Sequence, residues 1–216
     1  MTTAIIGIGS IGGPLARHLV AGGERVIVSA QNEAKAKEFA KQLGQLASAA
    51  PLKKAIADAD VVVFAVWLDT LKELIAVTAG LLKGKVVVDP TNPVKLDDKG
   101  QIVRTLPNGE SSGSIIAGLL PAGAHYVKAF GDHGAATLGS SANRKPDRVA
   151  LFYATDDDNA AIAVEKLIAA AGFDPVKAGG VKAAVRIELG GDLHEYGGLK
   201  GKVLNKREAV SAVAAK

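Results

Sequence analysis

The stretch Gly7-Ile8-Gly9-Ser10-Ile11-Gly12 has the spacing G-x-G-x-x-G and decides the fold of this 216-residue chain. It ends an apolar run that is predicted to be a strand, Thr3–Ile8, and it opens a helical pattern, Ile11–Ala21. In this context each glycine has a physical task. Gly7 permits a tight turn, Gly9 lets the backbone approach a pyrophosphate, and Gly12 lets the helix pack on the strand. Because the start of the helix offers free N–H groups to phosphates, the motif predicts dinucleotide binding.

The residues at the end of the second predicted strand, Arg25–Ser29, indicate which dinucleotide binds. NAD-binding proteins of this type place a carboxylate about 20 residues beyond the glycines, where it binds the ribose 2′-hydroxyl. No carboxylate stands at residues 29–32 of this chain, so nothing there repels a 2′-phosphate. The sequence therefore predicts NADP(H), although this stretch lacks an arginine that would bind a phosphate through two parallel hydrogen bonds. The residues predicted to contact the phosphate are Ser29, Gln31, Asn32 and Lys35.

Short β-branched runs alternate with helical stretches along the chain, without a repeat, a linker or a change of composition. The run Val61–Ala65 is apolar throughout, as expected for a parallel strand that is buried on both faces. The alternation predicts an α/β fold, with a single doubly wound domain and a mostly parallel sheet of about seven or eight strands. Residues 1–190 are predicted to form the nucleotide-binding domain, and residues 191–216 a C-terminal extension that packs on it or on a partner subunit.

Two long segments without periodicity are predicted to be loops, Val94–Gly113 and Gly131–Asp147. Structureless segments of this length inside a compact domain often carry function. A helix is expected near Val181–Leu189, and its Arg186 and Glu188 are interpreted as part of an exposed face rather than as catalytic groups.

The composition excludes several classes of protein. The absence of cysteine excludes disulfides, thiol nucleophiles, zinc–thiolate sites and iron–sulfur clusters. Aromatic residues make up only 4% and the net charge is only +4, so nucleic-acid binding is not indicated. The N-terminus does not resemble a signal peptide. No apolar run approaches the ~18–20 residues that span a bilayer. Together these two features predict a cytoplasmic protein without a membrane contact. No metal site is expected, because Asp156–Asp158 suit a helix cap and Asp192-Leu193-His194 offers too few ligands.

The excess positive charge lies in the C-terminal tail. Residues 200–216 hold five basic residues and one acidic residue, whereas the rest of the chain is neutral overall. This tail is therefore predicted to contact an anionic part of a ligand or a partner subunit.

Further candidate binding residues follow the fourth and fifth predicted strands. Ligands of open α/β sheets bind beyond the carboxyl ends of the strands. Thr91 and Asn92 are therefore predicted to contact the ribose or the carboxamide of the cofactor. Trp67 either covers the cofactor or simply packs against its neighbours.

Taken together, these segments resemble the NADPH-dependent F420 reductase family, also described as F420H2:NADP oxidoreductase-like dinucleotide-binding proteins. The resemblance extends from Thr3 to about Gly190. It implies a single Rossmann-type domain, often paired as a homodimer, that binds NADPH and exchanges hydride with a small-molecule acceptor, a flavin or a deazaflavin such as F420. The resembling segments are Ile6–Gly12, Ala59–Val62 with Val66-Trp67, Val88-Asp89 with Thr91–Pro93, and Val127–Phe130.

The resemblance also implies roles for individual residues. By this resemblance the loop that binds the pyrophosphate consists of Gly7, Gly9, Ser10, Ile11 and Gly12. Ser29 is implied to contact the 2′-phosphate. The resemblance further implies that Val66 and Trp67 lie on the nicotinamide side and that Val127–Phe130 line the acceptor side. Three departures leave the acceptor open. Ala30 and Gly131 replace an arginine and an asparagine that are common in the family, and the run Gly190–Leu199 lies outside the family pattern.

Two histidines are the candidate catalytic residues, His133 in the second long loop and His194 in the glycine-rich run. Either of them can donate a proton to an acceptor atom that gains negative charge, and the competing interpretation is a solvent-exposed loop histidine. Tyr196 is a weaker candidate for contact with the acceptor. His18 and His125 are interpreted as structural.

Two other functions stay open at this point. The chain is either a reductase of another small acceptor, such as a carbonyl, a quinone or a ferric chelate, or a redox sensor that binds NADP(H) without turnover. A carbonyl reductase is disfavoured because the chain has no Tyr-x-x-x-Lys pair and no long helical second domain to enclose a substrate.

Overall fold

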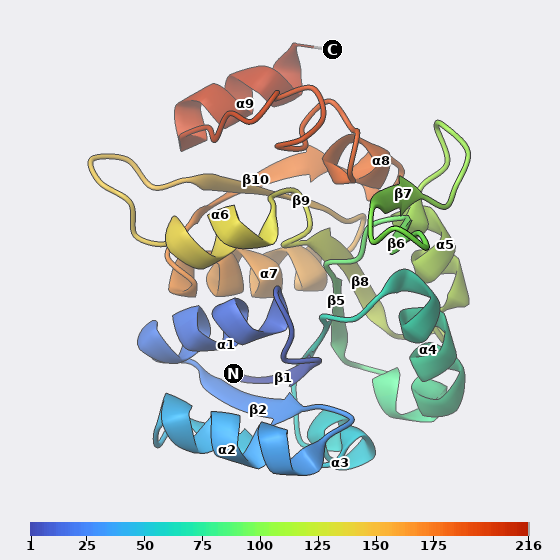
Figure 1. Ribbon diagram of the computed structural model, residues 1–216, viewed down its shortest axis with the longest axis vertical. Coiled ribbons are helices and arrows are strands. Elements are labelled where there is room, and N and C mark those ends of the chain that lie inside the picture. Colours follow the sequence, from blue (N-terminus) through green and yellow to red (C-terminus); the bar gives the residue numbers. More distant parts are fainter. Residues whose placement is uncertain (216) are drawn as a thin grey trace.

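The computed structural model describes residues 1–215, and in that part of the chain eight strands form one sheet (Figure 1). The strands are β1 (Thr2–Ile6), β2 (Arg25–Ser29), β3 (Ala47–Ala49), β4 (Val61–Phe64), β5 (Val86–Asp89), β8 (His125–Ala129), β9 (Ala150–Ala154) and β10 (Asp174–Gly179). Their order across the sheet is β10-β9-β8-β5-β4-β1-β2-β3, and all neighbours are parallel except β8 and β9. The predicted doubly wound, mostly parallel α/β fold is confirmed.

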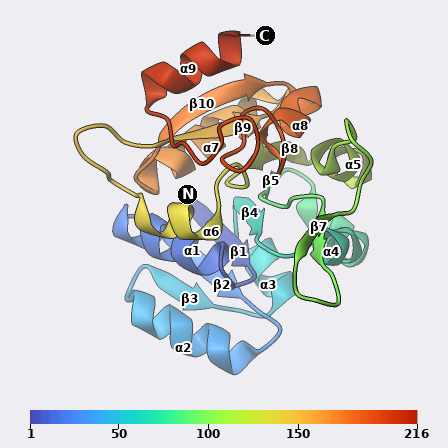
Figure 2. The same cartoon turned by 45° about the horizontal axis from the view of Figure 1, so that its top comes forward.

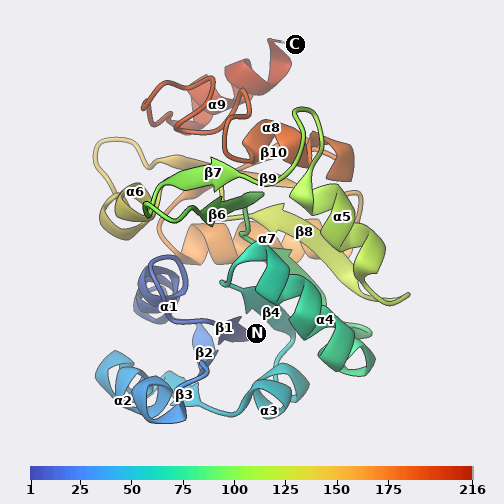
Figure 3. The same cartoon turned by 45° about the vertical axis from the view of Figure 1, so that its right-hand side comes forward.

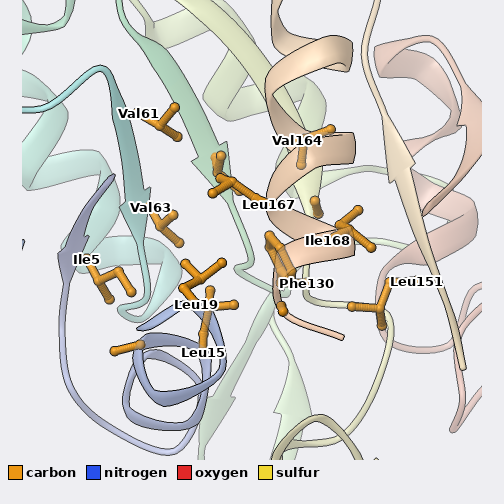
Figure 4. Close-up of a cluster of buried hydrophobic side chains, with 14 of the residues drawn as sticks. Ile5, Leu15, Leu19, Val61, Val63, Phe130, Leu151, Val164, Leu167 and Ile168 are labelled. Atoms are coloured by element: carbon orange, nitrogen blue, oxygen red, sulfur yellow. The ribbon is translucent and has the colours of Figure 1, made fainter. Parts of the chain in front are cut away.

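Helices cover both faces of this sheet (Figures 1 and 3). They are α1 (Gly12–Ala21), α2 (Glu33–Leu43), α3 (Leu52–Ala57), α4 (Leu68–Leu82), α5 (Ser112–Leu119), α6 (Ala135–Ser140), α7 (Asp158–Ala170), α8 (Ala184–Ile187) and α9 (Lys206–Ala214). Successive side chains of a strand point to opposite faces. In β4, Val61 and Val63 therefore pack with α1, α2 and α7, whereas Val62 and Phe64 pack with α3, α4 and α5. Figure 4 shows the first of these two layers.

The predicted loop Val94–Gly113 instead contains an antiparallel hairpin of β6 (Val94–Leu96) and β7 (Ile102–Arg104), and α5 begins at its end. The prediction was wrong because strands of three residues are too short to show periodicity. A side chain fixes the turn of the hairpin. The carboxylate of Asp97 accepts hydrogen bonds from the backbone N–H groups of Lys99 and Gln101 at 2.9 and 2.8 Å.

The predicted loop Gly131–Asp147 is interrupted by α6, which lies against α1 (Figure 2). The residue at the N-cap of this helix makes no capping hydrogen bond through a side chain. Glu195 supplies the cap from far along the chain, accepting hydrogen bonds from Gly134 N at 2.7 Å and from Thr137 Oγ1 at 2.8 Å. A cap that comes from 61 residues away leaves no local signal, which explains why the sequence did not indicate this helix.

The chain after β10 is also more structured than predicted. The expected helix Val181–Leu189 is a 3-10 turn, Val181–Ala183, followed by the short α8. Residues beyond 190 then pack onto the β9–β10 end of the sheet, where Leu193 and Ala209 join a small apolar cluster. The basic residues of the tail lie in or near α9, except Lys216, which is outside the described residues. No helix within residues 1–215 is long and apolar enough to cross a membrane.

Candidate functional site

The glycine loop lies at the carboxyl end of β1, which is flanked by β2 and β4 at the point where the strand order reverses. Open α/β sheets bind their ligands at this point. Gly7 has φ +96°, and a Cβ atom there would lie 2.3 Å from the carbonyl oxygen of Ala65. A Cβ on Gly12 would lie 1.9 Å from the carbonyl oxygen of Gly7. Packing therefore requires glycine at both positions.

Gly9 is different, because a Cβ at this residue would meet nothing within 4 Å. The protein fold itself gives no reason for glycine here. The first turn of α1 has no acidic residue and its N-cap, Ile11, makes no capping hydrogen bond through its side chain. An uncapped helix start carries a partial positive charge and attracts an anion. Open space at Gly9 beside such a helix end fits the pyrophosphate of a dinucleotide.

The residues predicted to contact a 2′-phosphate lie together at the turn between β2 and α2. Ser29 ends β2, and its carbonyl oxygen accepts a hydrogen bond from Gly7 N at 2.8 Å, which ties this turn to the glycine loop. Asn32 caps α2, since its Oδ1 accepts from Lys35 N at 2.9 Å. Gln31, Asn32 and Lys35 are exposed. Hydrogen-bond donors and one cation therefore gather at this turn.

The segments after β4 and β5 follow the carboxyl ends of the strands on the other side of β1 from β2. Val66 lies beside the glycine loop, 3.1 Å from the position of a Cβ on Gly7, and Trp67 starts α4 with 52% of its surface exposed. Asn92 uses both ends of its amide, donating to Gly131 O at 2.9 Å and accepting from Leu189 N at 2.7 Å. Its observed role is thus to join three loops. A contact of Asn92 or Thr91 with the cofactor stays a prediction.

A buried ionic network lies under the loop after β5, and the sequence did not indicate it. Lys128 Nζ donates to Asp89 Oδ2 and to Ser112 Oγ, each at 3.1 Å, and to the carbonyl oxygen of Thr91. Asp89 in turn accepts from Thr91 N at 2.8 Å and from Tyr126 Oη at 2.9 Å. Burial, together with the charge of Asp89, raises the pKa of Tyr126 well above its ordinary value. The network fixes the backbone that follows β5.

Glu188 completes this network and corrects the prediction that it lies on an exposed helix face. Its side chain is fully buried, and it lies 3.6 Å from Lys128 Nζ. Its carboxylate caps α5, accepting from Ser111 Oγ at 2.8 Å, from Ser112 Oγ at 2.9 Å and from Gly113 N at 2.8 Å. The sequence suggested exposure because the helix was expected to continue to Leu189, whereas α8 ends at Ile187.

His133 is buried rather than exposed, with 4% of its surface accessible. Its Nδ1 lies 3.0 Å from Asp132 Oδ2, which also accepts a hydrogen bond from Phe152 N at 2.9 Å. Burial lowers the pKa of His133, but the charge and hydrogen bond of Asp132 and the charge of Glu195 outweigh burial and leave this pKa raised. Within residues 1–215, His133 Nε2 and Asp132 Oδ1 are buried without a hydrogen-bond partner.

His194 is likewise buried, so the solvent-exposed interpretation is wrong for both histidines. Its Nδ1 accepts a hydrogen bond from Tyr196 N at 2.9 Å, which places the proton of the neutral ring on Nε2. Burial lowers the pKa of His194, and the positive charge of His133 lowers it further. The structure therefore brings both histidines into one cluster with Asp132 and Glu195, and Tyr196 lies over Gly134 at the edge of this cluster.

Two other histidines have structural contacts. His18 Nε2 donates to the carbonyl oxygen of Leu138 at 3.0 Å and so joins α1 to α6. His125 Nδ1 lies 2.6 Å from Asp157 Oδ2, and Asp157 caps α7 by accepting from Ala160 N at 3.0 Å. The described residues contain no group of three or more histidine, aspartate or glutamate side chains that could hold a metal ion.

The sheet topology and the glycine loop together define a dinucleotide-binding protein of the Rossmann class. Residues 2–93 match the model of a family described as NADP oxidoreductase, coenzyme F420-dependent. These residues span β1 to β5 with the glycine loop, so this part of the chain is similar to a family of NADP-dependent oxidoreductases. No protein with curated annotation matches the sequence.

Solved structures agree with the fold. The hypothetical protein SMa0349 from Sinorhizobium meliloti is 30% identical, with 95% of this chain and 96% of that chain covered and a TM-score of 0.81. A protein from Arthrobacter sp. FB24, provisionally described as an F420-dependent NADP reductase, is 22% identical over 87% of this chain and 90% of its own, with a TM-score of 0.72. A reductive aminase from Aspergillus terreus with bound NADPH is similar in fold only, at 19% identity and a TM-score of 0.63 over 85% of this chain and 56% of its own.

Proposed function

We propose that this protein transfers hydride between NADPH and a flavin- or deazaflavin-type acceptor, with F420 as the first candidate. The observation that carries the nucleotide half of the proposal is the contrast among the three glycines. Gly7 and Gly12 are required by packing, whereas Gly9 borders open space next to the uncapped start of α1. Because nothing in the protein crowds Gly9, the missing side chain leaves room for a ligand to approach the protein backbone there.

The residues that would hold NADPH are those of the glycine loop for the pyrophosphate, and Ser29, Gln31 and Lys35 for the 2′-phosphate. NADPH would supply the hydride, and the chain would need only to position the two reactants and to exclude water. The buried pair Lys128–Asp89 supports this task, because its hydrogen bonds with Thr91 hold the backbone that follows β5. Hydride transfer of this kind does not require a nucleophile and a base in the site.

The acid–base part of the proposal rests on His133 rather than on His194. Asp132 binds Nδ1 of His133 and so directs Nε2 away from itself, and that Nε2 has no partner within residues 1–215. The raised pKa of His133 increases the protonated fraction of this ring relative to an ordinary histidine, which suits a proton donor. The Nδ1 of His194 is already bonded to Tyr196 N and its pKa is lowered, which suits a structural group.

An anaerobic NADPH-oxidation assay tests the proposal. We expect turnover with F420 or FMN, and markedly slower turnover with NADH in place of NADPH. FAD, a quinone and a ferric chelate serve as the competing acceptors. Turnover with one of these three alone would replace the flavin or deazaflavin acceptor, and NADPH binding without turnover for any acceptor would identify a redox sensor instead.

A further inference from the structure

A hollow of about 250 Å³ lies between the start of α4 and the β6–β7 hairpin. Figures 2 and 3 show the hairpin beside the first turn of α4. One wall consists of Trp67, Leu68 and Asp69, and the other of the β6 residues Val94, Lys95 and Leu96. The hairpin was not indicated by the sequence, so this hollow exists only because of the tertiary structure.

The side chains around the hollow are unusually apolar for an exposed surface. Trp67 is 52% exposed, Leu96 is 53% exposed, and Ile102, which lies opposite Leu96 in the hairpin register, is 62% exposed. Contiguous exposed apolar side chains of this size usually mark a binding surface. The tryptophan ring offers a flat face on which another ring can stack.

The hollow also carries one lysine that has no ion-pair partner among the described residues. Within residues 1–215, Lys95 forms no ion pair, and its side chain is exposed. The carboxylate of Asp69 is instead paired with Lys72 at 3.0 Å. A ligand that combines an apolar ring with a negative charge would match both properties of this surface.

The position of the hollow connects it to the glycine loop. Trp67 directly follows Val66, which lies against the glycine loop at Gly7. Hydride transfer requires the reacting atoms of donor and acceptor to lie about 3–3.5 Å apart. An acceptor of hydride must therefore lie next to the bound nicotinamide, and this hollow begins at the residue after Val66, which lies against the glycine loop.

We propose that the hollow binds the flat ring system of the hydride acceptor, a heteroaromatic ring with an anionic tail. Trp67 and Leu96 contact the ring, and Lys95 binds the tail. This inference rests on the proposed function, since it names the acceptor side of the same site. The volume is below the range of about 300–1,000 Å³ that is usual for pockets enclosing a whole drug-sized ligand. The hollow therefore takes a ring system and leaves the tail outside, within reach of Lys95.

A second copy of the chain is the competing occupant of this surface. A stable interface buries roughly 800 Å² on each partner. Here the exposed apolar side chains border a hollow instead of forming a flat patch, and the chain offers no excess of negative charge to pair with Lys95. These features favour a small anionic ligand over a second copy.

The chain contains a single tryptophan, Trp67, so its fluorescence reports directly on this hollow. We expect FMN and F420 to quench the emission of Trp67 saturably in the absence of NADPH. Riboflavin, which has the same ring as FMN but no phosphate, separates contact with the ring from contact with the charge. Leu96→Ala is expected to weaken FMN and riboflavin equally, by about three- to tenfold, because it removes a ring contact.

Lys95→Ala is expected to weaken FMN by about fivefold and to leave riboflavin unchanged, because only FMN carries the phosphate. Lys99→Ala, which removes a lysine in the turn of the same hairpin, is the matched control and is expected to change neither. Thermal unfolding of each variant verifies that it is folded. Equal loss of FMN and riboflavin in Lys95→Ala would contradict the role of Lys95.

Separate measurements distinguish this inference from the proposed function. NADPH binding is followed by the fluorescence of NADPH itself. If NADPH binds but neither FMN nor F420 quenches Trp67, the ring site is wrong while the nucleotide site stands. If FMN quenches Trp67 but is not reduced by NADPH, the ring site stands and the hydride transfer is wrong. If sedimentation shows a dimer that Leu96→Glu dissociates, and no flavin quenches, a second copy covers the surface and the inference fails.

Discussion

The ammonium group of Lys128 lies 3.1 Å from the carboxylate of Asp89, and the two side chains are 1% and 0% exposed. They are partners in the parallel register of β5 and β8, so the sheet itself sets their separation. Taking two charges out of water is costly, and their attraction offsets this cost only when further hydrogen bonds satisfy both groups. The contacts with Thr91, Ser112 and Tyr126 satisfy them here.

Replacing Lys128 by methionine is expected to destabilise the protein by about 3–5 kcal/mol, because Asp89 and Glu188 then remain buried without a cation. Urea unfolding measures this change. The matched control is Lys54→Met, which breaks an ion pair with Asp58 whose side chains are 67% and 44% exposed. The control is expected to cost less than about 1 kcal/mol. Similar losses in the two variants would show that the buried pair contributes little to stability.

The glycine loop allows folding to be separated from binding. Gly9→Ala is expected to leave the melting temperature nearly unchanged, because a Cβ there meets nothing within 4 Å. It is also expected to weaken NADPH by at least about tenfold, since the methyl group occupies the space that the pyrophosphate approaches. Gly12→Ala is the opposite case and is expected to destabilise the fold by about 1–3 kcal/mol through overpacking. Calorimetry of binding and of unfolding measures both variants, and undiminished NADPH affinity in Gly9→Ala would place the cofactor elsewhere.

Lys35 and Lys37 provide a matched pair for the preference between NADPH and NADH. Both are exposed on α2, but only Lys35 lies in its first turn next to Ser29 and Gln31. Lys35→Ala is expected to weaken NADPH about threefold and to leave NADH unchanged, with a smaller effect at high salt because the charge is exposed. Lys37→Ala is expected to change neither. Equal effects of the two substitutions would mean that α2 attracts the cofactor only through its overall charge.

The two buried histidines are expected to make the free energy of unfolding depend on pH, and their two contributions change with pH in opposite directions. The pKa of His133 is raised above its ordinary 6.5, so the folded state binds more protons than the unfolded state above this pH. The stability that His133 contributes is therefore complete below pH 6.5 and is lost as the pH rises through its raised pKa. The pKa of His194 is lowered below 6.5, so its contribution is complete above pH 6.5 and is lost as the pH falls through its lowered pKa.

Urea unfolding between pH 5 and pH 8 tests this pair of signs. His133→Gln is expected to flatten the fall in unfolding free energy on the alkaline side, and His194→Gln the fall on the acid side. Asp132→Asn is expected to act like His133→Gln, because the charge of Asp132 is a cause of the raised pKa. If the unfolding free energy of both His133→Gln and Asp132→Asn still falls on the alkaline side as in the unaltered protein, Asp132 does not raise the pKa of His133.

The amino-acid sequence by itself determined the sheet and the glycine loop, and it predicted the nucleotide. Strands buried on both faces are continuous apolar runs, and the loop needs glycine for local steric reasons, so both leave a signal within a few residues. The absence of a carboxylate at residues 29–32, on which the choice of NADP(H) rests, is equally local. For this reason the fold class and the similarity to the family were predictable, and the predicted roles of His18, His125 and Asp157 agree with their contacts.

Only the tertiary structure decided how the acceptor side is built. Glu188 reaches α5 across 76 residues of sequence, Glu195 caps α6 across 61, and Lys128 meets Asp89 across 39. The hairpin that faces Trp67 is formed by strands of three residues. Buried charges are stable only where distant partners satisfy them, and a short strand is stable only where other parts of the chain support it. Neither condition can be seen in a local pattern, because both depend on which segments the folded sheet brings together.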